Sequence, residues 1–317
     1  MILGDKMKTI KITPRGYCHG VVGAINTITN LDLMSIDKPI YILGMLVHNK
    51  DIVSSLDLLG IKTLHDPSKT RLELLDQIDS GTVIFTAHGI SPIVFRKAQE
   101  KGLHIIDTSC KDVLKSQDAI KEFLSKNYDV LYIGKKGHPE SEAACDVSPH
   151  VHLIESKKAI DNLSHLKNVA ITNQTTMSLF DVYDLSEYAK TLFDNIHVVD
   201  EICNATRIRQ EAIIGQEKVD HCFIVGDTLS NNSKKLVQVS KEQAKINASL
   251  IENVEDLDIE FLKSIDSCSV SSGASTPTQI TTEVIQFLQQ FDKNDPSTHL
   301  LKKRVDKNYL FMKKSTS

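Results

Sequence analysis

The stretch LHIIDTSCKDVLKSQDAI, residues 103–120, combines a short apolar run, a cysteine and the start of a helical pattern. Two other stretches repeat this arrangement, TIKITPRGYCHGVVGAI at residues 9–25 and IHVVDEICNATRIRQEAI at residues 196–213. Their cysteines, Cys18, Cys110 and Cys203, are 92 and 93 residues apart. Equal spacing and similar local context predict a chain in three similar parts that brings one sulfur from each part to a common centre.

Other features recur at the same interval. Gly44, Gly134 and Gly226 each follow an apolar run and are 90 and 92 residues apart. Apolar, β-branched runs of strand length alternate with helical patterns, which indicates parallel sheets covered by helices. The predicted strands are Thr9–Thr13, Ile40–Leu46, Thr82–Ala87, Leu103–Asp107, Asp129–Gly134, Val151–Ile154, Val169–Thr172, Ile196–Val199, His221–Gly226 and Cys268–Ser271.

The predicted fold class is therefore α/β, with three similar domains and largely parallel sheets, arranged with pseudo-three-fold symmetry around a central site. We expect the units at residues 20–109, 110–199 and 200–291, the last joined by the N-terminal segment 8–19. Residues 292–317 end in the basic run LKKRVDKNYLFMKKSTS and are expected to form a mobile tail.

Composition and charge exclude several classes of protein. The 317 residues are 41% hydrophobic and 25% charged, with a formal net charge of −4, so the chain has the balance of a globular protein and no excess of basic residues for nucleic acid. No run approaches the ~18 apolar residues that span a membrane, and the N-terminus lacks an apolar signal core. We expect a cytoplasmic protein with no nucleic-acid or membrane partner and with reduced cysteines.

The three spaced cysteines are candidate metal ligands. Each precedes a helical pattern, and a thiolate at a helix N-terminus is favoured by the helix dipole and exposed N–H groups. No C-x-x-C motif is present. Three thiolates on an iron–sulfur cluster or on a zinc ion would leave a fourth position open for a substrate. Cys222 and Cys268 instead begin apolar runs and are predicted to be buried core residues.

Three histidines are candidate anion ligands. His48, His88 and His138 each follow a predicted strand, and ligands of open α/β sheets bind beyond the carboxyl ends of the strands. Imidazole N–H groups and helix N-termini both donate to phosphate oxygens. The last third offers neutral donors at the corresponding strand ends, namely Ser230, Asn231, Asn232 and Ser275.

Two further residues are candidates for proton transfer. Glu140 lies in the first turn of a predicted helix, two residues after His138, so it could relay protons at the anion site. Thr175 follows another predicted strand and offers a hydroxyl for the same task.

Nine motifs together resemble the 4-hydroxy-3-methylbut-2-enyl diphosphate reductase family. They run in order from about Thr9 to Phe291 and are long and specific. The motifs are PRGYCHGV, ILGMLVHN, FTAHG, TSC, YIGKKGHPE, TNQTTMS, CNATRIRQEA, VGDTLSNNS and SSGASTP.

The resemblance implies three α/β domains around one [4Fe–4S] cluster with three cysteine ligands, Cys18, Cys110 and Cys203, and one open iron. It implies reduction of an allylic diphosphate to isopentenyl and dimethylallyl diphosphate, the last step of the methylerythritol phosphate pathway, with Glu140 as proton donor. A ferredoxin or flavodoxin would supply the electrons. The substrate would be bound by His48, His88, His138, Thr175, Ser230, Asn231, Asn232 and Ser275.

The chain departs from the family pattern at three positions. Lys111 follows the middle cysteine, where proline is frequent, and His19 stands where many members carry a small or aromatic residue. Asn231 replaces a serine that many members have. These differences put the environment and the reduction potential of the cluster in question, and leave the reaction unchanged.

Two other functions fit the residues taken by themselves. One is a zinc enzyme with a three-cysteine site that acts on a phosphorylated small molecule. The other is a non-catalytic module that binds an anionic metabolite and buries structural thiols. The resemblance favours the reductase over both.

Overall fold

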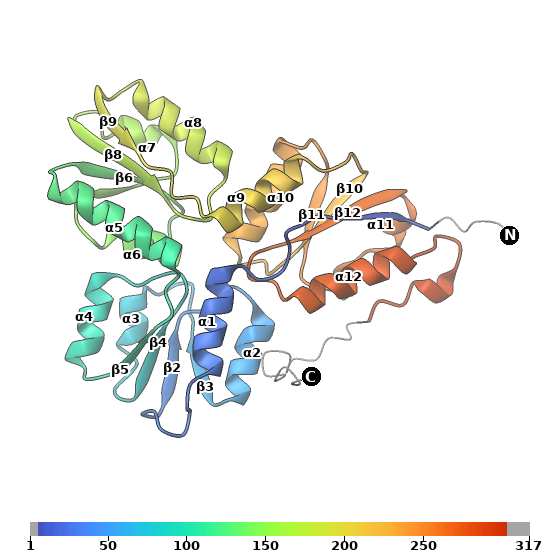
Figure 1. The fold of residues 1–317 in the computed structure, drawn as a ribbon, viewed down its shortest axis with the longest axis horizontal. Helices are drawn as coiled ribbons and strands as arrows, with labels where there is room; N and C mark the ends of the chain where they lie inside the picture. Colours follow the sequence, from blue (N-terminus) through green and yellow to red (C-terminus); the bar gives the residue numbers. More distant parts are fainter. Residues whose placement is uncertain (1–5, 303–317) are drawn as a thin grey trace. The chain divides into compact units, whose positions relative to one another are not determined.

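The computed structural model describes residues 6–302 and contains three four-stranded parallel sheets (Figure 1). Strands and helices alternate along the chain, as predicted. The described residues form two compact units. One comprises residues 6–18, 48–50 and 204–302 with the third sheet, and the other comprises residues 19–47 and 51–203 with the first two sheets. Within residues 6–302, no helix has both the length and the apolar character required to cross a membrane.

The first sheet has the strand order β3-β2-β4-β5. Its central strands β2 and β4 consist mainly of buried apolar residues, as expected for a parallel sheet covered by helices. Its strands are β2 (Ile40–Leu43), β3 (Ile61–Leu64), β4 (Thr82–Phe85) and β5 (His104–Asp107), and its helices are α1 (His19–Thr29), α2 (Lys50–Leu58), α3 (Arg71–Leu75) and α4 (Pro92–Glu100).

The second sheet has the equivalent order β7-β6-β8-β9. Leu131 and Ile133 belong to one core cluster, whereas Val130 and Tyr132 belong to another, so both faces of the sheet are buried. Its strands are β6 (Asp129–Ile133), β7 (Val151–Ile154), β8 (Asn168–Asn173) and β9 (Asn195–Val198), and its helices are α5 (Lys111–Ser125), α6 (Pro139–Cys145), α7 (Lys157–Asp161) and α8 (Leu179–Lys190).

The third sheet has the order β1-β12-β10-β11. Phe223 and Val225 face one core cluster, and Cys222 and Ile224 face the other. Its strands are β1 (Lys8–Lys11), β10 (His221–Val225), β11 (Ala248–Ile251) and β12 (Ser267–Ser272), and its helices are α9 (Asn204–Ile214), α10 (Asn231–Glu242), η1 (Val254–Asp256), α11 (Ile259–Lys263), α12 (Thr278–Gln290) and η2 (Pro296–Thr298).

The three sheets share one topology. Strands β2, β6 and β10 take equivalent places, β4, β8 and β12 lie beside them, and the edge beyond is filled by β5, β9 and β1. The N-terminal strand β1 pairs with β12 from Lys8 opposite Ser267 to Lys11 opposite Val270. A strand from the start of the chain thus completes the third sheet. The prediction of three similar α/β domains with parallel sheets is confirmed, and the exact boundaries of the three units remain predictions.

All ten predicted strands are present, and two further strands were not predicted. These are β3 and β11, each of which has two half-buried residues and lies at a sheet edge. The predicted tail begins with ordered residues, because His299 stacks on Phe291 with ring centroids 4.8 Å apart and Leu301 packs against the core of the third sheet. The basic residues 303–317 lie outside the described part of the chain.

Candidate active site

The three spaced cysteines occupy equivalent places in the fold. Each follows the edge strand of a sheet and precedes a helix, with Cys18 between β1 and α1, Cys110 between β5 and α5, and Cys203 between β9 and α9. Each backbone N–H donates to a carbonyl just beyond the neighbouring central strand. The N–H···O distances are 3.0 Å from Cys18 to Ala274, 3.0 Å from Cys110 to Ala87 and 3.1 Å from Cys203 to Thr175. The repeat seen in the sequence is therefore a repeat of backbone geometry.

The cysteines differ in burial as predicted. None of the six forms a disulfide, and Cys18, Cys110 and Cys203 are partly exposed. Cys222 and Cys268 are buried, and burial raises the pKa of the Cys268 thiol to about 12. Accessible thiols at the starts of helices suit metal ligation, whereas the buried thiols are core residues. Cys110 and Cys203 belong to one compact unit and Cys18 to the other, so the convergence of the three sulfurs remains a prediction.

His19 lies beside one of these thiols. Its Nε2 atom is 3.8 Å from Cys110 Sγ and 3.2 Å from an Asp112 carboxylate oxygen. Both neighbours accept hydrogen bonds, so Nε2 of His19 carries a hydrogen. Sequence reasoning missed Asp112, because an acidic residue in a first helical turn is an ordinary feature of helices.

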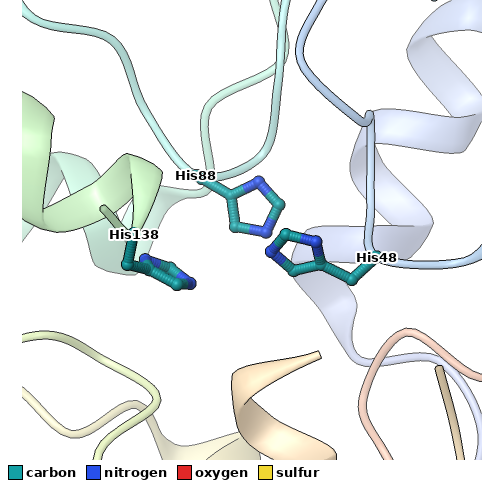
Figure 2. Close-up of side chains that lie close together, drawn as sticks. All are labelled: His48, His88 and His138. Carbon is teal, nitrogen blue, oxygen red and sulfur yellow. The ribbon is translucent and has the colours of Figure 1, made fainter. Parts of the chain in front are cut away.

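Two of the predicted anion-binding histidines lie in contact. The rings of His88 and His138 are 5.6 Å apart between centroids and stand at 86° to each other; Figure 2 draws them together with His48. His138 caps α6, and its Nδ1 accepts the Glu140 N–H at 3.2 Å. The neutral His138 ring therefore carries its hydrogen on Nε2, where it can donate to an oxyanion. His48 belongs to the other compact unit.

Glu140 is the acidic group of this site. Its side chain is almost fully buried, and its two oxygens accept hydrogen bonds from the Thr175 N–H at 2.8 Å and the Thr175 hydroxyl at 3.1 Å. Burial raises the pKa of the Glu140 carboxyl to about 7; the bonds from Thr175 oppose this rise, and the charge of Asp112 adds to it. A carboxyl with this pKa is protonated in part of the molecules near neutral pH and can act as a general acid.

The loop after β8 is held by a residue that sequence reasoning missed. The fully buried Gln174 accepts hydrogen bonds from the Lys135 N–H and the Ser141 hydroxyl, at 3.1 and 3.2 Å, and donates to the Thr176 hydroxyl at 2.8 Å. These bonds tie the loop that carries Thr175 to the start of α6. Only the position of Gln174 inside the motif TNQTTMS pointed to it.

The neutral donors gather in the unit of the third sheet. Ser230 caps α10, and Asn231 and Asn232 form the first turn of this helix. The Asn232 side chain accepts the Ala274 N–H at 3.0 Å, which fixes the direction of its amide, and the Ser275 hydroxyl donates to the His48 carbonyl at 3.1 Å. A helix start with buried amide and hydroxyl groups suits a phosphate group.

A family model described as LytB protein matches residues 9–289. The chain is 50% identical over 303 residues to the 4-hydroxy-3-methylbut-2-enyl diphosphate reductase of Anoxybacillus flavithermus, covering 94% of this chain and 96% of that protein. It is also 50% identical over 296 residues to the protein of the same name from Bacillus subtilis, covering 92% and 94%.

Two solved structures share the fold. The E-1-hydroxy-2-methyl-but-2-enyl-4-diphosphate reductase of Plasmodium falciparum matches with a TM-score of 0.82 and 32% identity, over 91% of this chain and 90% of that one. A second structure, titled as (E)-4-hydroxy-3-methyl-but-2-enyl diphosphate reductase, the terminal enzyme of the non-mevalonate pathway, matches with a TM-score of 0.63 and 27% identity, over 90% and 100%. The family model, the relatives and the structures agree, and the chain belongs to the LytB protein family, the oxidoreductases named 4-hydroxy-3-methylbut-2-enyl diphosphate reductase.

Proposed function

We propose that the chain reduces (E)-4-hydroxy-3-methylbut-2-enyl diphosphate to isopentenyl diphosphate and dimethylallyl diphosphate, as the last step of the methylerythritol phosphate pathway. Two electrons and two protons enter, the C–O bond of the allylic alcohol breaks, and water leaves. Support comes from relatives with half of their residues in common with this chain, and from the buried acid Glu140. The same relatives favour this reaction over a zinc enzyme.

The residues fit one [4Fe–4S] cluster held by Cys18, Cys110 and Cys203. The fit is supported by three partly exposed cysteines outside disulfides, each just before a helix, because cysteine thiolates are the ligands of such clusters. Bound by these thiolates, the cluster would supply the two electrons and the Lewis acidity of an iron without a protein ligand. A ferredoxin or flavodoxin in the cytoplasm would renew the electrons.

The diphosphate is bound by His48, His88, His138, Ser230, Asn231, Asn232 and Ser275, with Thr175 near the reacting end of the substrate. His138 offers its Nε2–H, since Nδ1 is engaged by its own helix. The start of α10 adds backbone N–H groups and the dipole of a 12-residue helix. These donors would stabilise the negative charge of the diphosphate through hydrogen bonds and the helix dipole.

Glu140 is the proton donor. Its burial keeps the proton on the carboxyl in part of the molecules near neutral pH, and Thr175 holds both oxygens in place. The proton goes to the substrate hydroxyl, which leaves as water, and a second proton completes the product at carbon. The Thr175 bonds then stabilise the carboxylate that remains until a new proton arrives.

The replacement Glu140→Gln tests this role. It keeps the shape of the side chain but removes the acid, so we expect unchanged cluster absorbance, unchanged substrate affinity and turnover reduced by at least about 100-fold, the usual contribution of a general acid. Glu155→Gln, at an exposed residue whose carboxylate accepts the Lys136 N–H, is the matched control and should keep full turnover. Near-normal turnover of Glu140→Gln would remove Glu140 from the mechanism.

A further inference from the structure

We propose that Tyr132 is a positioning residue for the proton donor, and that its buried hydroxyl donates a hydrogen bond to the Glu140 carboxylate whenever Glu140 has released its proton. The inference rests on the proposed function, in which Glu140 is that donor. Nothing in the sequence motifs singled out Tyr132, which sits inside the predicted strand Asp129–Gly134.

The ring of Tyr132 packs in the core next to α6. Tyr132 is fully buried in a core cluster with Ala144, and Cys145 packs against that cluster. The ring also covers Gly134, where an added Cβ would lie 2.9 Å from Cε1 of the tyrosine. The glycine therefore leaves the space that the ring fills.

The hydroxyl itself is poorly satisfied. Among residues 6–302 it has no hydrogen-bond partner of regular geometry. A buried hydroxyl without a partner destabilises a fold, and phenylalanine would fill the same space without this cost. Its polar neighbour is Glu140. Burial raises the pKa of the Tyr132 hydroxyl, and the charge of the nearby Glu140 raises that pKa further. The hydroxyl thus stays protonated and is available as a donor to the Glu140 carboxylate.

The internal repeat provides a comparison within the molecule. The residues equivalent to Tyr132, two before the glycine that ends each first strand, are Ile42 and Ile224, both fully buried. The residues equivalent to Glu140, six after that glycine, are Lys50 and Asn232. The same core position is apolar in the two repeats without the acid and carries a hydroxyl in the repeat that has it.

The other groups around Glu140 leave a place for this donor. Asp112, on α5, carries a charge that disfavours the Glu140 carboxylate. Thr175, in the loop after β8, donates one hydrogen bond to each Glu140 oxygen, and His138, which caps α6, accepts the Glu140 backbone N–H. An ionised carboxylate accepts about four hydrogen bonds. A third donor from β6 therefore favours the carboxylate, which agrees with the lowering effect of Tyr132 on the pKa of Glu140.

The test is Tyr132→Phe in the cluster-loaded enzyme under anaerobic conditions. Turnover falls with rising pH as Glu140 loses its proton, and we expect the midpoint of this fall to move up by about one pH unit, since a hydrogen bond to a charged group is lost. An independent readout is the infrared band of the protonated carboxyl, assigned by its disappearance in Glu140→Gln. Its titration midpoint should rise by the same amount.

Ser186→Ala is the matched control, because Ser186 on α8 is another buried hydroxyl without a regular partner among the described residues. This variant should leave both midpoints unchanged, and both variants should melt at or above the temperature of the parent enzyme. Unchanged midpoints in Tyr132→Phe, together with an inactive Glu140→Gln, would overturn this inference alone. Normal turnover of Glu140→Gln would instead remove the proposed donor.

Discussion

The raised pKa of Glu140 makes the stability of the protein depend on pH. The unfolded carboxyl titrates near its ordinary value of 4.5, and the folded one at about 7. The folded state therefore holds a proton that the unfolded state has already lost. This contribution to stability is complete below pH 4.5 and is lost as the pH rises through about 7. The two pKa values correspond to a total change of about 3 kcal/mol.

Glu140→Gln removes this titration and keeps the size of the side chain. Between about pH 5.5 and pH 8, the linkage predicts that the parent enzyme loses about 2 kcal/mol of unfolding free energy relative to the variant. The unfolding free energy of the glutamine variant should thus increase relative to that of the parent enzyme as the pH rises, although the variant has lost an acceptor for the bonds from Thr175.

The assay is urea denaturation of both anaerobic proteins at four or five pH values in this window, followed by circular dichroism. The quantity of interest is the difference between the two unfolding free energies as a function of pH. A difference that stays constant to within a few tenths of a kcal/mol would refute the raised pKa. A difference that changes in the opposite direction would refute the sign of the argument.

Two other substitutions follow from close contacts. Arg71→Met removes a buried guanidinium that donates to the Leu43 carbonyl and pairs with Glu142. We expect thermal denaturation to show a loss of about 2–3 kcal/mol of unfolding free energy, much of it regained when Glu142 is replaced as well. An unchanged melting temperature would contradict this expectation. Gly226→Ala would push a Cβ into the buried Ser233 side chain near the start of α10, so we expect a loss of about 1–3 kcal/mol of stability and a KM about tenfold higher, and an unaltered KM would argue against diphosphate binding there.

The repeat was predictable because its residues are local in the sequence. An apolar run followed by a cysteine or a histidine marks a strand end, and all ten predicted strands are present. Strands β3 and β11 were not predicted because polar residues interrupt their short apolar patterns, so tertiary pairing decides their conformation.

The candidate site was predictable to the extent that its chemistry lies in strand ends and helix starts. Glu140, Thr175 and His138 are joined by hydrogen bonds in the loop and helix where the sequence placed them. The supporting residues Asp112 and Gln174 were missed. Asp112 acts on Glu140, which lies 28 positions away in the chain, and Gln174 acts through its buried amide, which accepts hydrogen bonds from Lys135 and Ser141. No local pattern distinguishes such residues from ordinary helix and loop positions.

The most direct test of the account is the iron and acid-labile sulfide content of anaerobically purified protein. The account predicts a brown protein with about four irons and four sulfides per chain, as a [4Fe–4S] cluster requires, and loss of most of both when serine replaces Cys18, Cys110 or Cys203. Serine at the buried Cys222 should leave the content intact. A colourless protein that holds zinc, or full iron content in any of the three variants, would contradict a cluster held by these cysteines.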